Sequence, residues 1–201
     1  MIYTSGSTGV PIGVMVGHRE AANLFAACDQ VLGGADAAGG SNAGGSTWIS
    51  VTSISFDISV LELFWSLSRG VHVVLQPEGR DPDQSPVALA IAHGATHLQC
   101  TPSQLRMLVA EPQAASALGG IQKLLVGGEA LPPDLASMVL PILGGELINV
   151  YGPTETTVWS ACHVVTEDDQ RTVPIGAPIA NTSLYVLDEH RRPVPIGVQG
   201  E

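Results

Sequence analysis

The chain has 201 residues, of which 45% are hydrophobic and 13% charged, a composition that can bury a core. Eight lysines and arginines stand against 19 aspartates and glutamates, so the formal net charge is -11 at neutral pH. This charge would repel a phosphate backbone and an anionic lipid surface, which argues against nucleic acid and membranes as partners. A nucleotide is still compatible with it, because backbone N–H groups and a metal ion can hold phosphates.

The three cysteines, Cys28, Cys100 and Cys162, lie far apart and form no C-x-x-C pair. Their number and spacing suggest neither a disulfide framework nor a zinc site, and we interpret them as buried thiols in a reducing cytosol. No apolar run approaches the roughly 20 residues needed to span a bilayer, and no basic stretch followed by an apolar segment opens the chain. These features predict a cytoplasmic protein.

Helical and extended periodicities alternate along the chain. In chain order they predict a helix at 19–32, a Gly- and Ala-rich surface connection at 33–46, a strand at 48–53, a helix at 58–68 and a strand at 71–75. A helix at 86–93, a strand at 96–100, a helix at 102–110, a strand at 124–126, a helix at 132–140 and a strand at 147–150 follow. This alternation indicates an α/β fold whose mostly parallel sheet is flanked by helices on both faces. At 182–188 we expect antiparallel strands, the start of a β-rich portion.

Hydroxyl residues and glycines are interleaved near the start of the chain. The segment consists of Thr4, Ser5, Gly6, Ser7, Thr8 and Gly9. Glycine lets such a backbone fold into a concave set of N–H and O–H donors, which suits a polyphosphate. It is not a Walker A motif, because no Gly-Lys-Ser/Thr follows and the chain has a single lysine, Lys123. From composition alone, an ordinary Ser/Gly turn explains the segment as well as a phosphate loop does.

A second motif, Asn-Val-Tyr-Gly-Pro-Thr-Glu-Thr-Thr at 149–157, follows an apolar strand. Ligands of open α/β sheets gather at the carboxyl ends of the strands, where this motif falls. Tyr151 offers a ring to stack on a base, Thr154 a hydroxyl for a phosphate, and Glu155 a hard oxygen ligand for Mg²⁺. Taken one at a time, these residues are also common in turns and on surfaces.

Together, the two motifs resemble the adenylate-forming superfamily, which includes acyl-CoA synthetases, luciferases and the adenylation domains of nonribosomal peptide synthetases. Further segments look like the amino-acid-activating, peptide synthetase branch: Phe-Asp-Ile-Ser at 56–59, Val-Gly-Gly-Glu-Ala-Leu at 126–131, Ile-Gly-Ala-Pro-Ile-Ala-Asn-Thr at 175–182 and Pro-Val-Pro-Ile-Gly at 193–197. The resemblance covers nearly the whole chain. It implies that residues 1–201 are part of the large N-terminal subdomain of an adenylation domain, from the phosphate loop to just before the ribose-binding motif, with the C-terminal lid subdomain absent.

The resemblance also implies roles for the residues of both motifs. The first loop would close over the β- and γ-phosphates of ATP, Thr154 would approach the α-phosphate, and Glu155 would hold Mg²⁺. The implied nucleotide site consists of Gly128, Asn149, Tyr151 and Gly152, with the tyrosine ring stacked on the adenine. A substrate carboxylate would attack the α-phosphorus in line and expel pyrophosphate, a reaction that a protein promotes mainly by positioning and charge neutralisation. The product would then pass to the phosphopantetheine thiol of a peptidyl carrier domain, beside a condensation domain of the same assembly line.

Asp57 stands at the edge of an apolar stretch, where an ionised carboxylate is costly unless a cation pairs with it. By itself it is also typical of a helix cap, whereas the resemblance pairs it with the α-ammonium of an amino acid. The implied side-chain pocket consists of Asp57, Ile58, Leu61, Gln99, Leu125, Gly127, Val150, Val158 and Trp159. This set is close to the pattern of glycine-activating domains. Its bulky members would fill the space of a larger side chain, so we expect glycine first and alanine second, since one methyl group is worth only roughly 1–3 kcal/mol.

One position departs from the family pattern: Pro11-Ile12-Gly13 stands where Pro-Lys-Gly is usual. A positive charge that could help to hold or release pyrophosphate is therefore missing at Ile12. The family's ribose-binding motif, hinge and C-terminal lysine are also missing, so we expect the chain alone to be nearly inactive. Two alternatives stay open. An acyl- or aryl-CoA synthetase would have a substrate without an ammonium group for Asp57, and a degenerate nucleotide-binding module is favoured by Ile12.

Overall fold

The computed structural model describes residues 1–5, 11–33, 45–79 and 81–201. Residues 6–9 of the expected phosphate loop and most of the expected connection at 33–46 lie outside these ranges. Within the described segments, no helix combines the length and the apolar character needed to cross a membrane.

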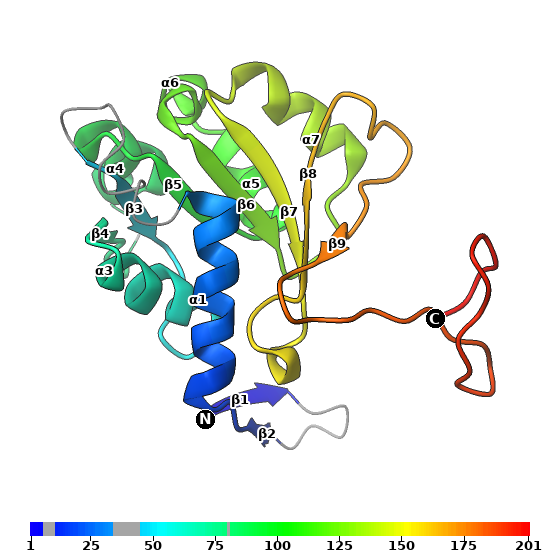
Figure 1. The fold of residues 1–201 in the computed structure, drawn as a ribbon. Coiled ribbons are helices and arrows are strands. Elements are labelled where there is room, and N and C mark those ends of the chain that lie inside the picture. Colours follow the sequence, from blue (N-terminus) through cyan, green and yellow to red (C-terminus); the bar gives the residue numbers. More distant parts are fainter. Residues whose placement is uncertain (6–10, 34–44, 80) are drawn as a thin grey trace.

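A seven-stranded sheet forms the centre of the molecule (Figure 1). Its strands, in spatial order, are β4 (His72–Leu75), β3 (Thr47–Ser50), β5 (His97–Cys100), β6 (Lys123–Gly127), β7 (Glu146–Tyr151), β8 (Ala161–Val164) and β9 (Ala177–Pro178). The first five run parallel, and β8 and β9 extend the sheet antiparallel at one edge. A separate hairpin pairs β1 (Ile2–Ser5) with β2 (Pro11–Val14). The carboxyl ends of the five parallel strands thus lie together, and this end of the sheet is called its carboxyl edge below. Ligands of such sheets bind there.

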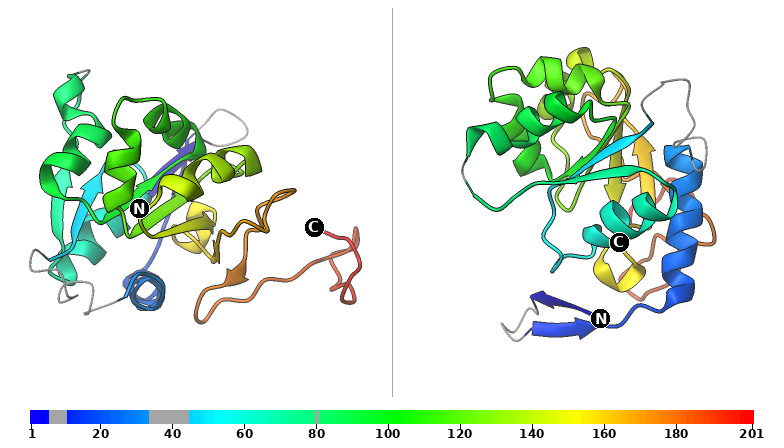
Figure 2. Two further views of the ribbon diagram at one scale, coloured as in Figure 1. Left: turned by 90° about the horizontal axis from the view of Figure 1, so that it is seen from above. Right: turned by 90° about the vertical axis from the view of Figure 1, so that its left-hand side faces the viewer.

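Helices cover both faces of the sheet (Figure 2). One face, the α1 face, carries α1 (His18–Leu32) and a helical stretch made of the π-helical η1 (Val60–Trp65) and α3 (Ser66–Ser68). The opposite face, the α4 face, carries α4 (Pro86–His93), α5 (Pro102–Val109), α6 (Ala114–Gly120) and α7 (Pro133–Val139), with the short turns η2 (Pro82–Gln84) and η3 (Leu140–Ile142). A further 3-10 turn, η4 (Thr154–Thr156), follows β7 at the carboxyl edge of the sheet.

The side chains of each strand alternate between two cores, one on each face. On β6, Leu124 packs into the core of the α4 face, and its neighbour Leu125 packs into the core of the α1 face. The α4-face core is built from aliphatic side chains and Cys100. The core of the α1 face contains all three tryptophans of the chain: Trp48, Trp65 and Trp159.

Two helices of the α4 face begin with side-chain caps. Ser85 Oγ accepts a hydrogen bond from the N–H of Ala88 at 3.2 Å at the start of α4, and Gly94 ends that helix in a left-handed conformation. Thr101 and Gln104 form a capping box at the start of α5. Such a cap typically stabilises a helix by about 1 kcal/mol. On the other face, neither α1 nor η1 begins with a side-chain hydrogen bond of this kind.

The structure confirms the α/β fold with its mostly parallel sheet covered on both faces. The helix expected at 58–68 is present, but its central part is π-helical, and the strand expected at 48–53 ends at Ser50. No pattern predicts α6, whose run of alanines and glycines carries little periodicity, nor the short antiparallel strands β8 and β9. Where strands were expected at 182–188, the structure has only an isolated bridge between Leu187 and Pro193, and residues 183–201 extend away from the body (Figure 1). The antiparallel part of the sheet lies earlier, in β8 and β9.

Candidate functional site

Asp57, Thr154 and Val158 line one cavity of about 190 Å³ at the carboxyl edge of the sheet. Asp57 comes from the loop between β3 and η1, and its side chain is half-buried. Thr154 and Val158 come from the turn that follows β7. The rest of the lining comes largely from the β1–β2 hairpin and the start of α1. The fold therefore brings the predicted ammonium-binding carboxylate and the predicted phosphate-binding hydroxyl to one place from distant parts of the chain.

The chain passes through a strained turn directly after η4. Thr157 and Val158 have φ angles of 73° and 66°, in the left-handed region that β-branched residues rarely adopt. The N–H of Trp159 donates to the carbonyl of Thr157 at 2.8 Å, so Val158 is the central residue of a γ-turn of the rare, strained kind. Each such residue costs of order 1–3 kcal/mol, which the surrounding packing must offset. The turn places Val158 on the cavity wall and Trp159 in the core.

Two of the predicted glycines allow unusually close backbone contacts. A Cβ at Gly152 would lie 2.4 Å from the Cα of Trp159, where the chain returns after the γ-turn. A Cβ at Gly127 would lie 2.4 Å from the carbonyl oxygen of Val150 on the neighbouring strand. Any side chain at either position would push these segments apart. Both glycines therefore shape the site by having no side chain.

The other predicted pocket residues pack in the core of the α1 face. Leu61, Leu125, Val150, Val158 and Trp159 belong to one cluster, with Ile58 packed against it. Gln99 lies on β5 in register with Leu125. Gln99 Oε1 and Trp159 Nε1 are buried and have no hydrogen-bond partner among the described residues. An unpaired buried polar atom is costly, so these two atoms are candidates for contact with a ligand or an ordered water.

A second cavity, of about 370 Å³, lies at the ends of β6 and β7. All four residues predicted to bind the nucleotide line it: Gly128, Asn149, Tyr151 and Gly152. Tyr151 is 48% exposed, so its ring is accessible for stacking. Asn149 is buried, and its Nδ2 donates to the carbonyl of Pro174 at 2.7 Å. Its amide N–H is thus used to hold the segment around Pro174 against the cavity.

Glu155, the predicted Mg²⁺ ligand, is exposed in η4 beside the half-buried Thr154. In the part of the chain that the structure describes, no group of three or more His, Cys, Asp or Glu side chains is arranged to hold a metal ion. A Mg²⁺ ion that accompanies a nucleotide needs only one or two protein carboxylates, because phosphates and water complete its shell. A single accessible carboxylate at this edge therefore fits such an ion.

The expected phosphate loop is described only at its first two residues. Thr4 and Ser5 belong to β1, where their partners on β2 are Ile12 and Pro11. Gly6, Ser7, Thr8 and Gly9 lie outside the described residues. Ile12, at the position where the family pattern has lysine, is 54% exposed. A side chain at this position therefore faces solvent in part, as a functional lysine would.

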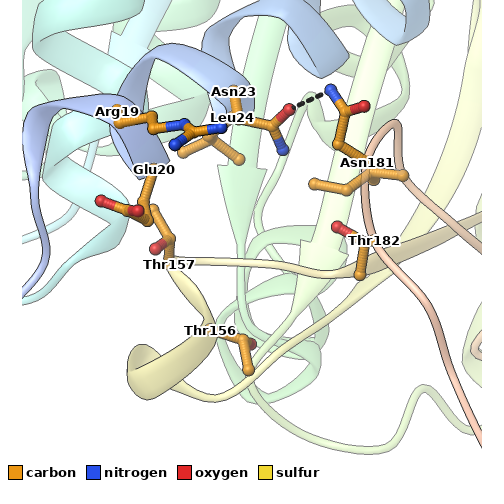
Figure 3. A pocket seen from close by; sticks show the side chains of 9 residues that line it. Arg19, Glu20, Asn23, Leu24, Thr156, Thr157, Asn181 and Thr182 are labelled. Atoms are coloured by element: carbon orange, nitrogen blue, oxygen red, sulfur yellow. Dashed lines mark hydrogen bonds between the residues drawn. The ribbon is translucent and has the colours of Figure 1, made fainter.

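A further cavity, of about 500 Å³, adjoins the η4 turn and was predicted by no sequence pattern (Figure 3). Its lining includes Arg19 and Asn23 of α1, Thr156 of η4, and Asn181. Asn181 Nδ2 donates to Asn23 Oδ1 at 2.7 Å, and Asn23 Nδ2 donates to the carbonyl of Ala180 at 3.0 Å. These bonds tie α1 to the segment after β9. The sequence carries no signal for this pairing, because the two asparagines are distant in the chain and each is common in loops and on surfaces.

Burial shifts the pKa of several groups in the two cores. Burial raises the pKa of Glu62, an effect that hydrogen bonds from Ser50, Val51 and Thr52 partly offset. Burial, and then the charge of Lys123, lower the pKa of His97 to about 4. Burial also raises the pKa of Cys100 to about 12, so this thiol is not a nucleophile at neutral pH.

Comparisons with known proteins connect this geometry to a family. Residues 1–201 match the family model described as AMP-binding enzyme. A dimodular nonribosomal peptide synthase from Bacillus subtilis is 38% identical over 205 residues, which cover 100% of this chain and 8% of that protein. The structure of holo-AB3403, a four-domain nonribosomal peptide synthetase bound to AMP and glycine, is 37% identical with a TM-score of 0.79, covering 99% of this chain and 14% of that one.

The N-terminal subdomain of NpsA from Klebsiella oxytoca, in complex with 3-hydroxybenzoyl-AMSN, has the same fold. Its TM-score is 0.81 at 23% identity, over 100% of this chain and 49% of that one. The chain spans only 2% to 8% of the length of three curated relatives that it matches, so similarity alone does not transfer the activities of those large proteins. The family model, by contrast, matches this chain from its first residue to its last, and the protein therefore belongs to the AMP-binding enzymes.

Proposed function

We propose that this domain activates an amino acid by joining its carboxylate to the AMP part of ATP, with release of pyrophosphate. The observation that carries the proposal is the shared cavity of Asp57, Thr154 and Val158. A carboxylate that suits an ammonium group and a hydroxyl that suits a phosphate line the same small space. An α-amino acid has an ammonium group two bonds away from its carboxylate carbon, so one bound molecule can meet both.

In this proposal, each end of the substrate has its own partner. Asp57 pairs with the α-ammonium, and its half-buried position strengthens that attraction relative to a pair in open water. Thr154 donates a hydrogen bond to the α-phosphate. A substrate carboxylate oxygen then attacks the α-phosphorus, the bond to the oxygen that bridges the α- and β-phosphates breaks, and its electron pair leaves with pyrophosphate. Glu155 would hold Mg²⁺, which would neutralise phosphate charge, and the residues themselves contribute positioning.

The cavity at the ends of β6 and β7 is the proposed place of the adenine. The exposed face of Tyr151 stacks on the base, and Gly128 and Gly152 leave room for it. The phosphates would then extend from this cavity towards η4, which carries Thr154 and Glu155, and residues 4–9 are the proposed phosphate loop.

Glycine is the proposed first substrate, with alanine second. Leu61, Leu125 and Trp159 are at most 1% exposed and pack in the core of the α1 face, and we propose that these bulky side chains form the closed inner end of the substrate pocket. The relative that is bound to AMP and glycine, at 37% identity, supports this choice. Discrimination against one extra methyl group is worth about 1–3 kcal/mol unless it clashes, so some activation of alanine is expected.

The proposed product is an aminoacyl-AMP, a reactive mixed anhydride that needs an acceptor. The peptide synthetases among the relatives support a carrier-protein phosphopantetheine thiol as that acceptor, beside a condensation domain of the same assembly line. Activation, transfer and condensation would then follow one another in one assembly line.

Exchange of labelled pyrophosphate into ATP, measured on the full-length protein that carries this domain, tests the proposal. Glycine should support exchange, alanine should support less, and benzoate none. Exchange with benzoate but not with glycine would instead identify an aryl-CoA synthetase, whose substrate has no ammonium group for Asp57.

Ile12 is the observation that favours a second candidate, a degenerate nucleotide-binding module. A half-exposed isoleucine stands where the family pattern has a cation. In the proposed enzyme, Ile12→Lys should raise the exchange rate, because the added charge can hold pyrophosphate. If ATP binds but neither the wild type nor Ile12→Lys exchanges label with any amino acid, the domain is a binding module.

A further inference from the structure

Glu62 is fully buried, although it carries an ionisable carboxyl group. Its Oε2 accepts hydrogen bonds from Ser50 Oγ at 2.8 Å and from the N–H of Thr52 at 3.2 Å. Its Oε1 accepts from Thr52 Oγ1 at 3.2 Å and from the N–H of Val51 at 3.4 Å. A buried carboxylate is tolerated only when its oxygens are hydrogen-bonded. Here all four donors come from one stretch of three residues.

These bonds join the two ends of the loop that carries Asp57. Ser50 is the last residue of β3, and Val51 and Thr52 begin the loop. Glu62 lies just beyond its other end, in η1. One side chain therefore closes the loop over residues 51–61, and Asp57 lies near the middle of the closed segment.

The second half of this loop is held by bonds of its own. The N–H of Phe56 donates to the carbonyl of Ser53 at 2.9 Å, Ser59 Oγ donates to the carbonyl of Phe56 at 2.6 Å, and the N–H of Val60 donates to the carbonyl of Asp57 at 2.9 Å. These contacts make residues 53–60 a compact turn. The place of that turn relative to the sheet then depends on its two anchors, β3 and η1, which Glu62 connects.

The π-helical geometry of η1 accounts for the direction of Glu62. The N–H of Ser66 donates to the carbonyl of Leu61, five residues earlier, which adds a residue to the turn and changes which side chains face the sheet. Leu61 then packs in the cluster that contains Trp159, while Glu62, also buried, reaches the end of β3. Such π-turns are frequently found at functional sites.

We propose that Glu62 is a positioning residue for substrate binding: its carboxylate fixes where Asp57 stands relative to Thr154. The inference rests on the proposed function, because it treats Asp57 as the partner of the substrate's ammonium group. Thr154 and Tyr151 belong to a different part of the chain, after β7. Loss of the Glu62 anchor therefore displaces Asp57 from the amino acid and leaves the nucleotide site in place.

Glu62→Gln in the full-length protein tests this inference, because the amide keeps the shape and presents a donor where two donors already point. The KM for glycine should rise about tenfold, as expected for the loss of one or two hydrogen bonds, while the KM for ATP changes less than about twofold. Ser85→Ala is the matched control, since it removes a helix cap and a 2.7 Å bond to Glu111 on the α4 face. It should leave both KM values unchanged. Equal increases in both KM values for Glu62→Gln would overturn the inference.

Hydrogen exchange of the backbone amides gives a readout that does not depend on activity. Glu62→Gln should speed exchange at residues 51–58 about tenfold and leave the amides of α4 unchanged. Unchanged exchange at 51–58 would overturn the inference. If the wild type activates no amino acid, the proposed function fails, and this measurement still decides whether Glu62 holds the Asp57 loop.

Discussion

On the α4 face, α4 and α5 begin with side-chain caps and the helices pack an aliphatic core. On the α1 face, an α1 without a side-chain cap at its start and a π-helical η1 cover a core that contains three tryptophans. The same sheet supports both, and its strands contribute equally buried residues to each side. The two faces therefore differ in the regularity of their helices and not in how deeply their core residues are buried.

Three of the irregularities of the α1 face fall on predicted pocket residues, namely Gln99, Val158 and Trp159. Trp48 Nε1, Gln99 Oε1 and Trp159 Nε1 are buried there without a partner among the described residues, and the γ-turn at Val158 is strained. Each of these features lowers the stability of the free protein. The α4 face, with its ordinary caps and apolar packing, can offset that loss. We therefore expect the α4 face to contribute mainly to stability, and the α1 face to contribute the residues of the proposed amino-acid pocket.

Among substitutions that test this division, Asp57→Ala should have the largest effect on activity. Asp57→Ala removes the proposed partner of the ammonium group, and glycine-dependent pyrophosphate exchange should fall about 100- to 1000-fold. Asp134→Ala, which removes an exposed carboxylate on α7, is the matched control and should change exchange less than about twofold. Unchanged exchange in Asp57→Ala would rule out its role in substrate binding.

Truncation of two adjacent leucines on β6 can distinguish an effect on core packing from an effect on substrate selectivity. Leu124 and Leu125 are both fully buried, on opposite faces of the same strand. Truncation of either to alanine should destabilise the protein by about 2–5 kcal/mol, measured by denaturant unfolding. Only Leu125→Ala should also raise the ratio of alanine to glycine activation, by about tenfold, because it opens space in the proposed pocket. An equal change in that ratio for Leu124→Ala would contradict the division between the faces.

His97, buried on the α1 face, should make stability depend on pH. Its pKa is lowered to about 4, chiefly by burial. At a pH between this value and the ordinary pKa of histidine, the unfolded chain therefore binds a proton that the native protein does not bind. The stabilising difference is fully present above about pH 6.5 and is lost as the pH falls towards 4, by about 3 kcal/mol in total. Unfolding free energies measured from pH 7.5 to 4.5 should show this slope in the wild type. His97→Phe should lose that part of the slope, and an unchanged slope would contradict the assignment.

The smallest expected difference concerns one ion pair on each face. Arg69 binds Asp29 through two bonds of 2.8 and 2.7 Å, and Arg106 meets Asp134 through one contact of 3.3 Å in an exposed position. Arg69→Met should lower the free energy of unfolding by about 1 kcal/mol, because a two-point pair is better ordered. Arg106→Met should change it by less than about 0.5 kcal/mol. Equal shifts in the denaturation midpoint for the two variants would show that the two-point geometry of the Arg69–Asp29 pair adds nothing to stability.

Much of the fold was predictable, because hydrophobic periodicity and turn residues are local properties. The helix at 86–93 and the five parallel strands follow from such patterns, and so does the carboxyl edge as the place of the site. The small residues of α6 and the short antiparallel strands β8 and β9 carry too little pattern to be predicted. The motif at 149–157 correctly predicts that Thr154 and Tyr151 lie at the carboxyl ends of the strands, but not that the side-chain amide of Asn149 binds the carbonyl of Pro174 far along the chain.

The amino-acid sequence by itself determined the α/β class and the resemblance to adenylate-forming enzymes, since periodicity and contiguous motifs depend only on residues that are close together in the sequence. Only the tertiary structure decided that Asp57 and Thr154 share one cavity, that Val158 sits in a strained γ-turn, and that Glu62 closes the Asp57 loop. Each of these depends on contacts between distant segments, and the free energy of packing, not local propensity, sets them.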